Sequence, residues 1–431
     1  MISLPDTMKK TPALVALSTI FLLPSLARAQ DVDAHVYGTF LPFVDNVRTT
    51  GETKPGPSPG AGDAALVPGA AYTGVSLPNR NRMTSGTSNL GVRASLGVNP
   101  HLQVFAQVES SISPDGDAPN VLAGRNTAVG LAGDWGRAFF GSWDTPYKYP
   151  TLFVTPLRGL STFDNAMTAN PGFNVPGTTT QSGRVNGKAD AAFSRRQGNS
   201  LQYWTPVVYG VSARFAYSMN EGKTTNASGT TISPAIGSAL VTWEQGPFGV
   251  RYGYERHQDY FGLSQLGGST AATPTNPSSR DQGHELVGWY EAPTRTKLSV
   301  IGERLIYDSG DKAPGAVDHY DRNAWYALLQ QRIGDSQVWV AYGQASHGDA
   351  RFVGGASAST RGLGAQQWSI GYSYSVAKSA DLYACYYGLR NDKSSSYSVF
   401  PGIGTVAPGG DTVGVGFGVL YTFDVGWATK M

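Results

Sequence analysis

The feature that most constrains this chain is the strict alternation of apolar side chains with small or polar ones along short segments. The clearest segment is "VGVGFGVLYTF", residues 413–423, where every second residue is apolar or aromatic and most of the others are glycine. Period-two alternation predicts a β-strand with different chemistry on its two faces. In a soluble sandwich the second face normally carries polar side chains, whereas in a membrane barrel it faces the lumen. This stretch alone leaves both folds open.

The whole chain contains sixteen such segments, separated by turn-forming sequences. They are residues 33–43, 87–97, 100–112, 124–133, 135–143, 198–206, 210–220, 233–245, 247–257, 281–291, 294–306, 318–332, 335–346, 364–376, 379–391 and 411–423. The gaps alternate between short ones, such as 245–249, and long ones, such as 144–197. An outer-membrane barrel has short periplasmic turns and long external loops, and an even strand count keeps both ends of the chain in the periplasm. We therefore predict an all-β fold: a sixteen-stranded antiparallel transmembrane β-barrel, an integral multi-pass protein of the cell outer membrane.

Such a barrel requires a seam. Backbone N–H and C=O groups in hydrocarbon must all be paired, so the sheet cannot leave an open edge. Segment 413–423 therefore has to pair with the first segment, "DAHVYGTFLPF", residues 33–43. The glycine-rich face of the last segment is expected to look into the lumen, where it leaves space.

The N-terminal residues have the order of a secretory signal peptide. Two lysines precede an apolar run over residues 13–23, and the small-x-small sequence Ala27-Arg28-Ala29 follows. The apolar run is too short to span a bilayer as a helix, which needs about 20 residues. We predict a signal peptide over residues 1–29 and a single barrel domain over residues 30–431.

Charge and composition exclude several classes of protein. The formal net charge of +2 falls to zero without the predicted signal peptide, which carries three basic residues and one acidic residue. A neutral chain is not a polyanion binder, so no nucleic acid partner is expected. No apolar stretch of 18 residues follows the signal, which excludes an α-helical membrane protein. The single cysteine, Cys385, cannot form an internal disulfide.

The longest gap, residues 144–197, is the candidate for narrowing the pore. Sixteen strands enclose a lumen too wide to be filled by wall side chains. The stretch "YPTLFVTPLRGLSTF" within this gap is rich in apolar residues, which favours packing against the inner wall. We expect this third external loop to fold inward as a constriction. A surface loop exposed to water is the alternative.

Charged residues in the loop and on the wall suggest a mild anion preference. Between Asp144 and Arg196 the chain carries six basic and three acidic residues. Fixed charges in a narrow mouth bias which ions enter. Alternation turns a set of charged wall residues toward the lumen: Arg93, Arg214 and Arg251, with Glu109 and Glu255 as acidic counterparts. A salt-bridged structural role for each arginine stays open beside a role in selectivity.

Four stretches resemble the Gram-negative general (trimeric) porin family, β-proteobacterial type. They are "SNLGVRASLGVNPHLQVFAQVESS" (88–111), "RNTAVGLAGDWGRAFFGSWDTPY" (125–147), "RRQGNSLQYWTP" (195–206) and "WSIGYSYSVAKSADLYACYYG" (368–388). The resemblance covers essentially the whole mature chain. It implies a sixteen-stranded barrel, usually a homotrimer in the lipid bilayer and lipopolysaccharide of the outer membrane. Such a general diffusion porin passes small hydrophilic solutes and ions passively.

The resemblance also implies roles for individual residues. Arg196 matches an arginine of the family's constriction cluster, and Asp164 is the expected acid on the loop side. Asn89 and Ser142 stand where many members carry basic residues, so Arg93 and Arg214 are candidates to replace them. Related porins end on a phenylalanine that the outer-membrane assembly machinery reads. Here "DVGWATKM" follows Phe423, which is expected either to serve with a short tail or to be hidden by it.

No enzyme is expected, because no catalytic constellation stands out. The six histidines are scattered without metal-ligand spacing, so neither a metal site nor another cofactor is expected. Two other functions stay open. One is a substrate-selective channel for a sugar or an aromatic acid, which would use Trp143, Tyr147, Tyr149 and Phe153 near the constriction. The other is a barrel that acts mainly as a surface adhesin. A soluble secreted β-enzyme is a third interpretation.

Overall fold

The computed structural model describes most of the expected barrel domain. The described residues are 31–54, 74–116, 120–157, 167–168, 170–173, 191–219, 221–225, 229–266, 277–399 and 406–430. The expected signal peptide lies outside them. So does part of the long segment 144–197, including Asp164. Within the described residues, no helix combines the length and the apolar character needed to cross a membrane.

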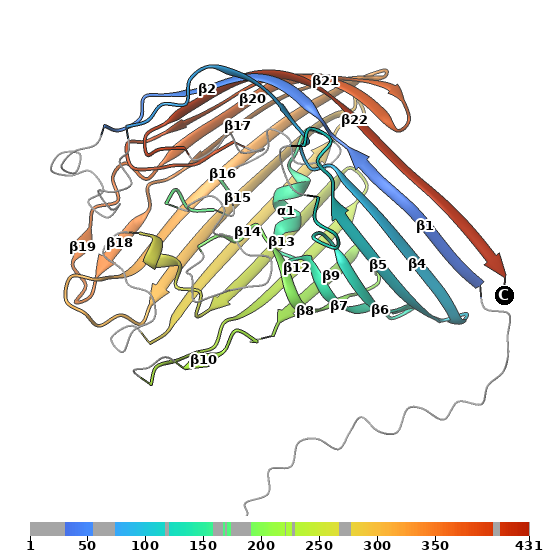
Figure 1. Ribbon diagram of the computed structural model, residues 1–431, viewed down its shortest axis with the longest axis horizontal. Helices are drawn as coiled ribbons and strands as arrows, with labels where there is room; N and C mark the ends of the chain where they lie inside the picture. The colour runs from blue at the N-terminus through green and yellow to red at the C-terminus, as the bar shows by residue number, and fades with distance from the viewer. Residues whose placement is uncertain are drawn as a thin grey trace, which may run out of the picture.

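One antiparallel sheet of 20 strands closes on itself (Figure 1). β1 and β2 are two halves of one bent strand, and β3 and β4 form a second, while β18 and β19 make a small hairpin beyond the wall. Sixteen wall strands remain, and each is hydrogen-bonded to its neighbour along the chain. The predicted sixteen-stranded antiparallel barrel is confirmed.

The strands and short helices have the following bounds. The first half of the barrel comprises β1 Asp31–Phe40, β2 Phe43–Thr50, β3 Arg80–Thr84, β4 Asn89–Asn99, β5 Leu102–Ser111, β6 Thr127–Gly133, β7 Gly136–Asp144, α1 Lys148–Phe153, β8 Arg196–Trp204 and β9 Val211–Ser218. The second half comprises β12 Ala235–Gln245, β13 Phe248–Gln258, η2 Gly262–Gln265, β14 Ser279–Glu291, β15 Thr296–Ser309, β16 Val317–Ile333, β17 Ser336–Ala345, β20 Ala365–Ala377, β21 Ala380–Asn391 and β22 Asp411–Lys430. Four short strands lie in loops: β10 Thr224–Thr225, β11 Thr231–Ile232, β18 Asp349–Phe352 and β19 Ser357–Ala358.

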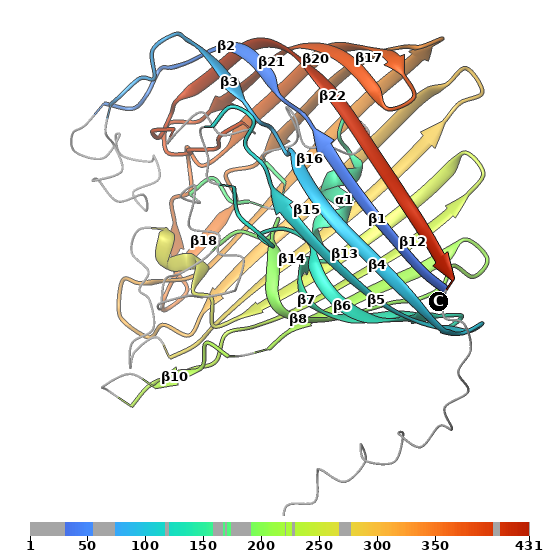
Figure 2. The same ribbon diagram turned by 45° about the vertical axis from the view of Figure 1, so that its right-hand side comes forward.

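The seam joins the first and last wall strands, as predicted. β22 pairs with β1 from Asp31↔Lys430 to Phe40↔Tyr421, and its first half pairs with β2 (Figure 2). The last strand was expected to end at Phe423, but it continues through the residues that follow. Val425 and Trp427 keep the outward, apolar parity of the strand and are 52% and 55% exposed. The expected tail is therefore part of the wall.

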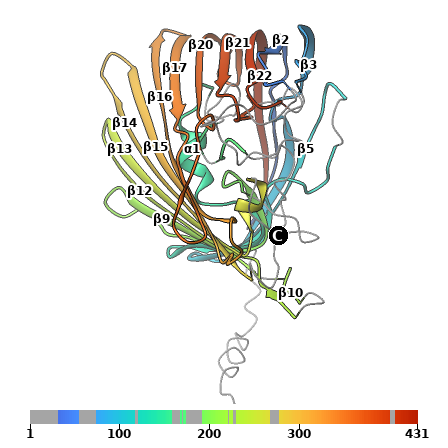
Figure 3. The ribbon, with the colours of Figure 1, turned by 90° about the vertical axis from the view of Figure 1, so that its left-hand side faces the viewer.

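Short turns and long loops separate to opposite ends of the barrel (Figure 1). Two-residue turns such as Gly246-Pro247 lie at the end that also holds the C-terminus, and the long connections lie at the other end. This matches the periplasmic and external ends of an outer-membrane barrel. Helix α1 lies inside the ring of strands (Figure 3).

The two faces of the wall differ as the alternation requires. On β22, Val415 and Phe417 face outward and are 54% and 65% exposed, whereas Leu420 faces inward and is fully buried. The glycine-rich face looks inward, but it does not border open space. A Cβ atom on Gly414 would lie 2.3 Å from the Tyr387 hydroxyl, and a Cβ atom on Gly418 would lie 2.5 Å from the Tyr383 hydroxyl. Glycine on β22 thus makes room for the tyrosines of β21.

Candidate functional site

The chain after β7 turns into the lumen and lies along the inner wall. The Tyr147 backbone N–H donates to Ser238 Oγ at 3.0 Å, and Thr151 Oγ1 donates to Glu285 Oε1 at 2.7 Å. Further along, the Pro156 carbonyl accepts hydrogen bonds from Gln330 and Gln337. These contacts reach from β12 to β17. The described part of the loop is therefore folded inward, as expected for a constriction.

Buried carboxylates and one arginine on the wall hold this loop. The Tyr147 hydroxyl donates to Glu303 Oε1 at 3.0 Å, and Glu303 Oε2 lies 2.8 Å from Arg322 Nη2. Arg322 also donates to the carbonyl oxygens of Met167 and Asn170, at 2.7 and 2.6 Å. All these side chains of the wall are buried. A buried charge is stable only when it is paired and hydrogen-bonded. Removing the loop would therefore leave Glu303 and Arg322 buried without their hydrogen-bond partners from the loop.

The returning part of the loop packs against the same wall. The Tyr307 hydroxyl donates to the Ala191 carbonyl oxygen at 2.6 Å, and the Phe193 ring stacks on His257 with a centroid distance of 4.2 Å. His257 Nε2 lies 2.8 Å from Glu255 Oε1. Glu255, expected from its parity to face the lumen, therefore points inward but is covered by the loop and fully buried.

A cluster of four cations lies between helix α1 and the periplasmic turns. Its members sit near the turn ends of four strands: Arg137 on β7, Arg214 on β9, Arg251 on β13 and Lys297 on β15. We call this set the vestibule cluster. The predicted residues Arg214 and Arg251 are both members, and they line a common cavity of about 460 Å³ with Tyr149 and Glu244.

Aromatic rings hold the cluster in place. The Arg214 guanidinium lies 4.1 Å from the ring centroids of both Tyr149 and Trp204. Arg251 and Lys297 lie over the Phe153 ring at 3.9 and 4.1 Å. Attraction of a cation to a ring face contributes about 0.5–2 kcal/mol without neutralising the charge. Since Tyr149 and Phe153 belong to α1, the inward loop itself supplies the rings that fix the cations.

The vestibule cluster is poor in carboxylates. Arg251 Nη2 lies 2.8 Å from Glu244 Oε1. Over the described residues, Arg137, Arg214 and Lys297 have no carboxylate oxygen within 4.0 Å. Burial raises the pKa of the Tyr149 hydroxyl to about 12, although the nearby Arg214 opposes the shift, so this tyrosine stays neutral at ordinary pH. The cluster therefore keeps a net positive charge.

The other predicted pore residues lie elsewhere and are paired. Arg93 Nη2 lies 2.6 Å from Asp424, and its guanidinium covers the Tyr37 ring at 5.2 Å. Glu109 accepts a hydrogen bond from the Tyr37 hydroxyl at 3.0 Å and pairs with Arg125 at 2.5 Å. These four charged groups lie on β4, β5, β22 and the segment before β6, and none of them is a member of the vestibule cluster.

Arg196 lies at the mouth of the loop. Its Nη2 is 3.2 Å from Asp144 Oδ1, and Lys148 Nζ is 2.9 Å from the same carboxylate oxygen. The Arg196 side chain is only 8% exposed, so the carboxylate and its two cations form a largely buried group. Asp164, the expected acid on the loop, lies outside the described residues.

Sequence reasoning missed Arg137 and Lys297. The alternation pattern could have identified both residues. Each lies next to a short turn, at a position of its strand whose side chain faces the lumen. Leu298 and Val300 alternate outward on β15, which turns Lys297 inward. On β7 the neighbouring residues Phe139 and Phe140 are both apolar and obscure the parity, but only Phe140 is exposed. The aromatic partners from α1 could not be read from alternation at all.

Comparison with known proteins gives a consistent result. A model of the family described as Gram-negative porin matches residues 13–394. The chain is 23% identical over 348 residues to the major outer membrane protein P.IA of Neisseria meningitidis serogroup A, which covers 75% of this chain and 82% of that protein.

Solved structures share the fold. The anion-selective porin from Comamonas acidovorans is 19% identical with a TM-score of 0.65, over 91% of this chain and 100% of that one. The trimer form of OmpT, an outer membrane protein of Vibrio cholerae, is 14% identical with a TM-score of 0.55, over 92% of this chain and 100% of that one.

Proposed function

This chain belongs to the Gram-negative porin family, and we propose that its pore passes anions more readily than cations. As an outer-membrane diffusion porin, it spans the membrane as a closed barrel and lets small hydrophilic solutes and ions pass down their gradients. The observation that carries the anion preference is the vestibule cluster, in which four cations outnumber the two neighbouring carboxylates, Glu244 paired with Arg251 and Glu291 opposite Lys297.

The proposal depends on where unpaired positive charge lies in the pore more than on the total number of basic residues. Arg93, Arg125 and Arg196 each have a carboxylate within 3.2 Å, so their fields largely cancel at a distance. Arg214 lines the cavity of about 460 Å³ and, over the described residues, has no carboxylate oxygen within 4.0 Å. Such a site raises the local concentration of anions and lowers that of cations.

The test is the reversal potential across a KCl gradient, measured on reconstituted protein. We expect the wild-type channel to favour chloride. In the triple variant R214Q/R251Q/K297Q the chloride-to-potassium preference should fall by about fourfold for each charge removed, because a unit charge about 8 Å away in water changes the concentration of each ion by about twofold, in opposite senses. The control is R256Q, which removes an outward-facing arginine of β13. Cation selectivity in the wild type, or an equal shift in R256Q, would overturn the proposal.

Oligomeric state and assembly are further parts of the proposal. A homotrimer is supported by family membership and by the trimer form of the Vibrio cholerae neighbour. Recognition by the assembly machinery through Phe423 is supported by membership of the porin family and by the parity of Phe423, which lies two residues after Tyr421 on the same face of β22. Chemical cross-linking of the protein in native outer membranes tests the trimer.

A second candidate function is selective passage of aromatic carboxylates. Of the aromatic residues expected near the constriction, Tyr147 is fully buried, but Tyr149 and Phe153 lie beside cations of the vestibule cluster. A ring next to a fixed cation suits a ligand that has both a ring and a carboxylate. Block of the chloride current by benzoate, but not by cyclohexanecarboxylate, at sub-millimolar concentration would favour this function over a general pore.

A further inference from the structure

The last residues of β22 form an edge of the sheet that no other described strand covers. Over the described residues, the ladder between β21 and β22 ends at Ala380↔Tyr421. One more hydrogen bond follows, from the Thr422 N–H to the Ser379 carbonyl oxygen at 2.8 Å. On its other side, β22 stays paired with β1 through its last described residue. β22 therefore runs past the start of β21 with one neighbouring strand instead of two (Figure 2).

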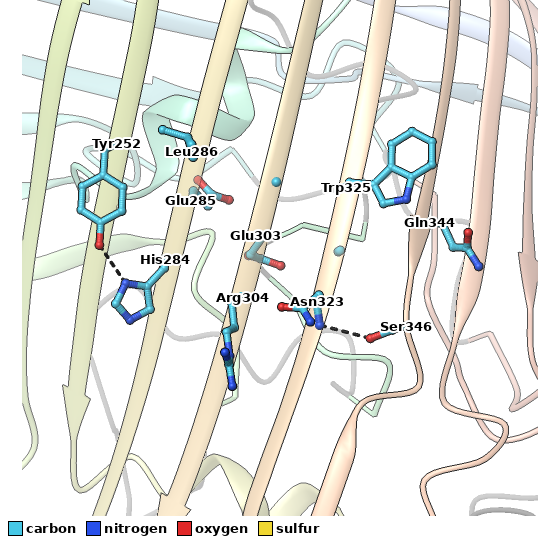
Figure 4. Close-up of a pocket in the computed structure, with 12 residues that line it drawn as sticks. Tyr252, His284, Glu285, Leu286, Glu303, Arg304, Asn323, Trp325, Gln344 and Ser346 are labelled. Carbon is cyan, nitrogen blue, oxygen red and sulfur yellow. Dashed lines mark hydrogen bonds between the residues drawn. The ribbon is translucent and has the colours of Figure 1, made fainter.

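In the middle of the wall, by contrast, each strand has a neighbour on both of its edges. Figure 4 shows this for β13 to β17, where Tyr252, Arg304 and Gln344 stand on strands of one continuous ladder. Backbone groups in hydrocarbon must be paired, so an edge with a single neighbour needs either water or a further strand. The uncovered edge of β22 lies at the end of the barrel that holds the short turns (Figure 1).

The hydrogen bonds around β22 show which of its backbone groups belong to the uncovered edge. The Val419 N–H donates to the Pro42 carbonyl oxygen on the β1 side, whereas the Thr422 N–H donates toward β21. Successive residues of a strand direct their N–H and C=O groups to opposite edges. Even-numbered residues of β22 therefore face the β21 side. Beyond Thr422, where no described strand lies on that side, they are Asp424, Gly426, Ala428 and Lys430.

The outward side of this edge is apolar. Val425 and Trp427 point away from the lumen and are 52% and 55% exposed. From Val425 to Thr429 the sequence is VGWAT, which contains neither a charged residue nor a proline. Natural proteins use charged residues and proline to keep a strand edge from pairing with another chain. This edge lacks both over five consecutive residues.

Side chains inside the barrel hold the edge in an extended conformation. The two carboxylate oxygens of Asp424 lie 2.6 Å from His35 Nδ1 and 2.6 Å from Arg93 Nη2. The His35 imidazole also lies against Gly426, where a Cβ atom would be 2.7 Å from the ring. These contacts tie β22 to β1 and β4. The edge is therefore ordered before a partner arrives, which lowers the entropy lost on binding.

We propose that the uncovered edge of β22 binds an extended segment of a periplasmic protein, which adds to the barrel as a further strand. Backbone donors and acceptors that recur at every second residue match the backbone of another extended chain. Main-chain hydrogen bonds supply the affinity in this mode of recognition, and alternate side chains supply the sequence preference. The segment that fits has an apolar or aromatic residue beside Val425 and Trp427, and small or polar residues on its other face.

A second copy of this chain does not fit the edge. Pairing of β22 with β22 of another copy requires a twofold axis, which for two barrels in one membrane runs along the membrane normal. Barrel strands tilt by about 35–45° from that normal, so the two edges would cross at about 70–90°. Paired strands differ in direction by only about 20–25°. The partner is therefore a chain that is free to align with β22.

The test uses the refolded barrel in detergent and a synthetic peptide with the sequence of residues 31–40, DVDAHVYGTF, with which β22 already pairs on its other edge. Amide hydrogen exchange is measured at single-residue resolution. Without peptide, we expect the N–H groups of Gly426 and Ala428 to exchange about tenfold faster than those of Val425 and Trp427, which face β1. Saturating peptide should slow exchange at Gly426 and Ala428 by about tenfold, and a scrambled peptide without alternation should not.

A matched pair of variants separates edge binding from general effects. A428P removes one N–H donor of the uncovered edge, whereas A428S keeps it, and neither changes an N–H that faces β1. A428P should lose peptide binding and A428S should keep it, while heat-dependent mobility in SDS gels equal to the wild type verifies that both have folded. In cells, p-benzoylphenylalanine in place of Trp427 should cross-link to a periplasmic protein in the A428S background and not in the A428P background.

Three results would overturn the proposal. The first is slow exchange at Gly426 and Ala428 without peptide, because the edge would then already be covered. The second is equal slowing by the scrambled peptide or in A428P. The third is a cross-linking pattern in cells that is the same in the A428S and A428P backgrounds.

Discussion

At the scale of single residues, Tyr147 connects the inward loop to the wall through its backbone and its side chain. Its amide binds Ser238 on β12, and its hydroxyl binds Glu303 on β15. Burial and the nearby Glu303 and Glu285 raise the pKa of Tyr147 well above its usual value, so the hydroxyl remains a donor at any ordinary pH. One phenol therefore supplies a permanent hydrogen bond to a buried carboxylate.

The variant Y147F should loosen the loop without changing its packing. Loss of a hydrogen bond to a buried charged group costs about 1.5–3 kcal/mol. We expect more frequent current fluctuations in single-channel recordings and faster cleavage of the loop by protease. The control is Y149F, because the Tyr149 hydroxyl accepts a hydrogen bond from Trp143 of β7 and, over the described residues, donates to no wall carboxylate. Identical behaviour of Y147F and the wild type would contradict this role.

Alternation along the sequence could predict which wall side chains face inward, but not which of them meet. Arg93, Arg214 and Arg251 all face the lumen as expected. The partner of Arg93 is Asp424, from a segment that was expected to be a tail, and the partners of Arg214 come from α1 and β8. Such contacts depend on the height of each residue in the barrel and on the path of the loop. The period-two alternation of a strand predicts neither the height of a residue in the barrel nor the path of the loop.

At the scale of elements, β22 is longer than its sequence alternation predicted. Most predicted strand boundaries agree with the wall strands to within a few residues, because turn-forming sequences delimit them. Three strands differ more: β2 continues to Thr50 beyond the predicted end at residue 43, β3 begins at Arg80 before the predicted start at residue 87, and β22 continues to Lys430. Asp424 interrupts the pattern on the inward face, where a polar residue is allowed, and Val425 and Trp427 continue the pattern outside. The prediction ended the strand at Phe423, because the porin resemblance places the last strand residue at a phenylalanine.

Deleting residues 424–431 should weaken the seam. The deletion removes the partners of residues 31–37 on β1, from Asp31↔Lys430 to Tyr37↔Asp424. Backbone groups left unpaired in the membrane cost several kcal/mol each, so the barrel should unfold at a lower temperature. Heat-dependent mobility of the folded protein in SDS gels measures this. The control D424N keeps every backbone hydrogen bond and should unfold close to the wild-type temperature.

At the scale of the whole molecule, ion preference depends on the balance of paired and unpaired charge along the pore. Arg93, Arg125 and Arg196 are paired with carboxylates, whereas the vestibule cluster near the periplasmic turns has one ion pair for its four cations over the described residues. Unpaired charges beside water are screened by salt over about 10 Å at 0.1 M and about 3 Å at 1 M. The preference of the pore should therefore depend on ionic strength.

Raising KCl from about 0.1 M to about 1 M, at a fixed concentration ratio across the membrane, should reduce the chloride preference of the wild-type channel severalfold. The variant R214Q/R251Q/K297Q should change far less over the same range, because it lacks the charges that salt screens. Reversal potentials at each mean concentration give both values. An anion preference that does not depend on salt would place its origin in pore width or in paired groups instead.

The seam between β1 and β22 determines how such a protein can be made. His35 and Asp424 are in contact although they are 389 residues apart in the chain. Contacts this distant form late, because the intervening chain must first be ordered. Until the last strand arrives, the growing sheet has two free edges that can pair with other chains. A truncated chain that lacks the final strand therefore cannot close the barrel. The exported chain must be kept from aggregating by a chaperone until the final strand is available to pair with β1.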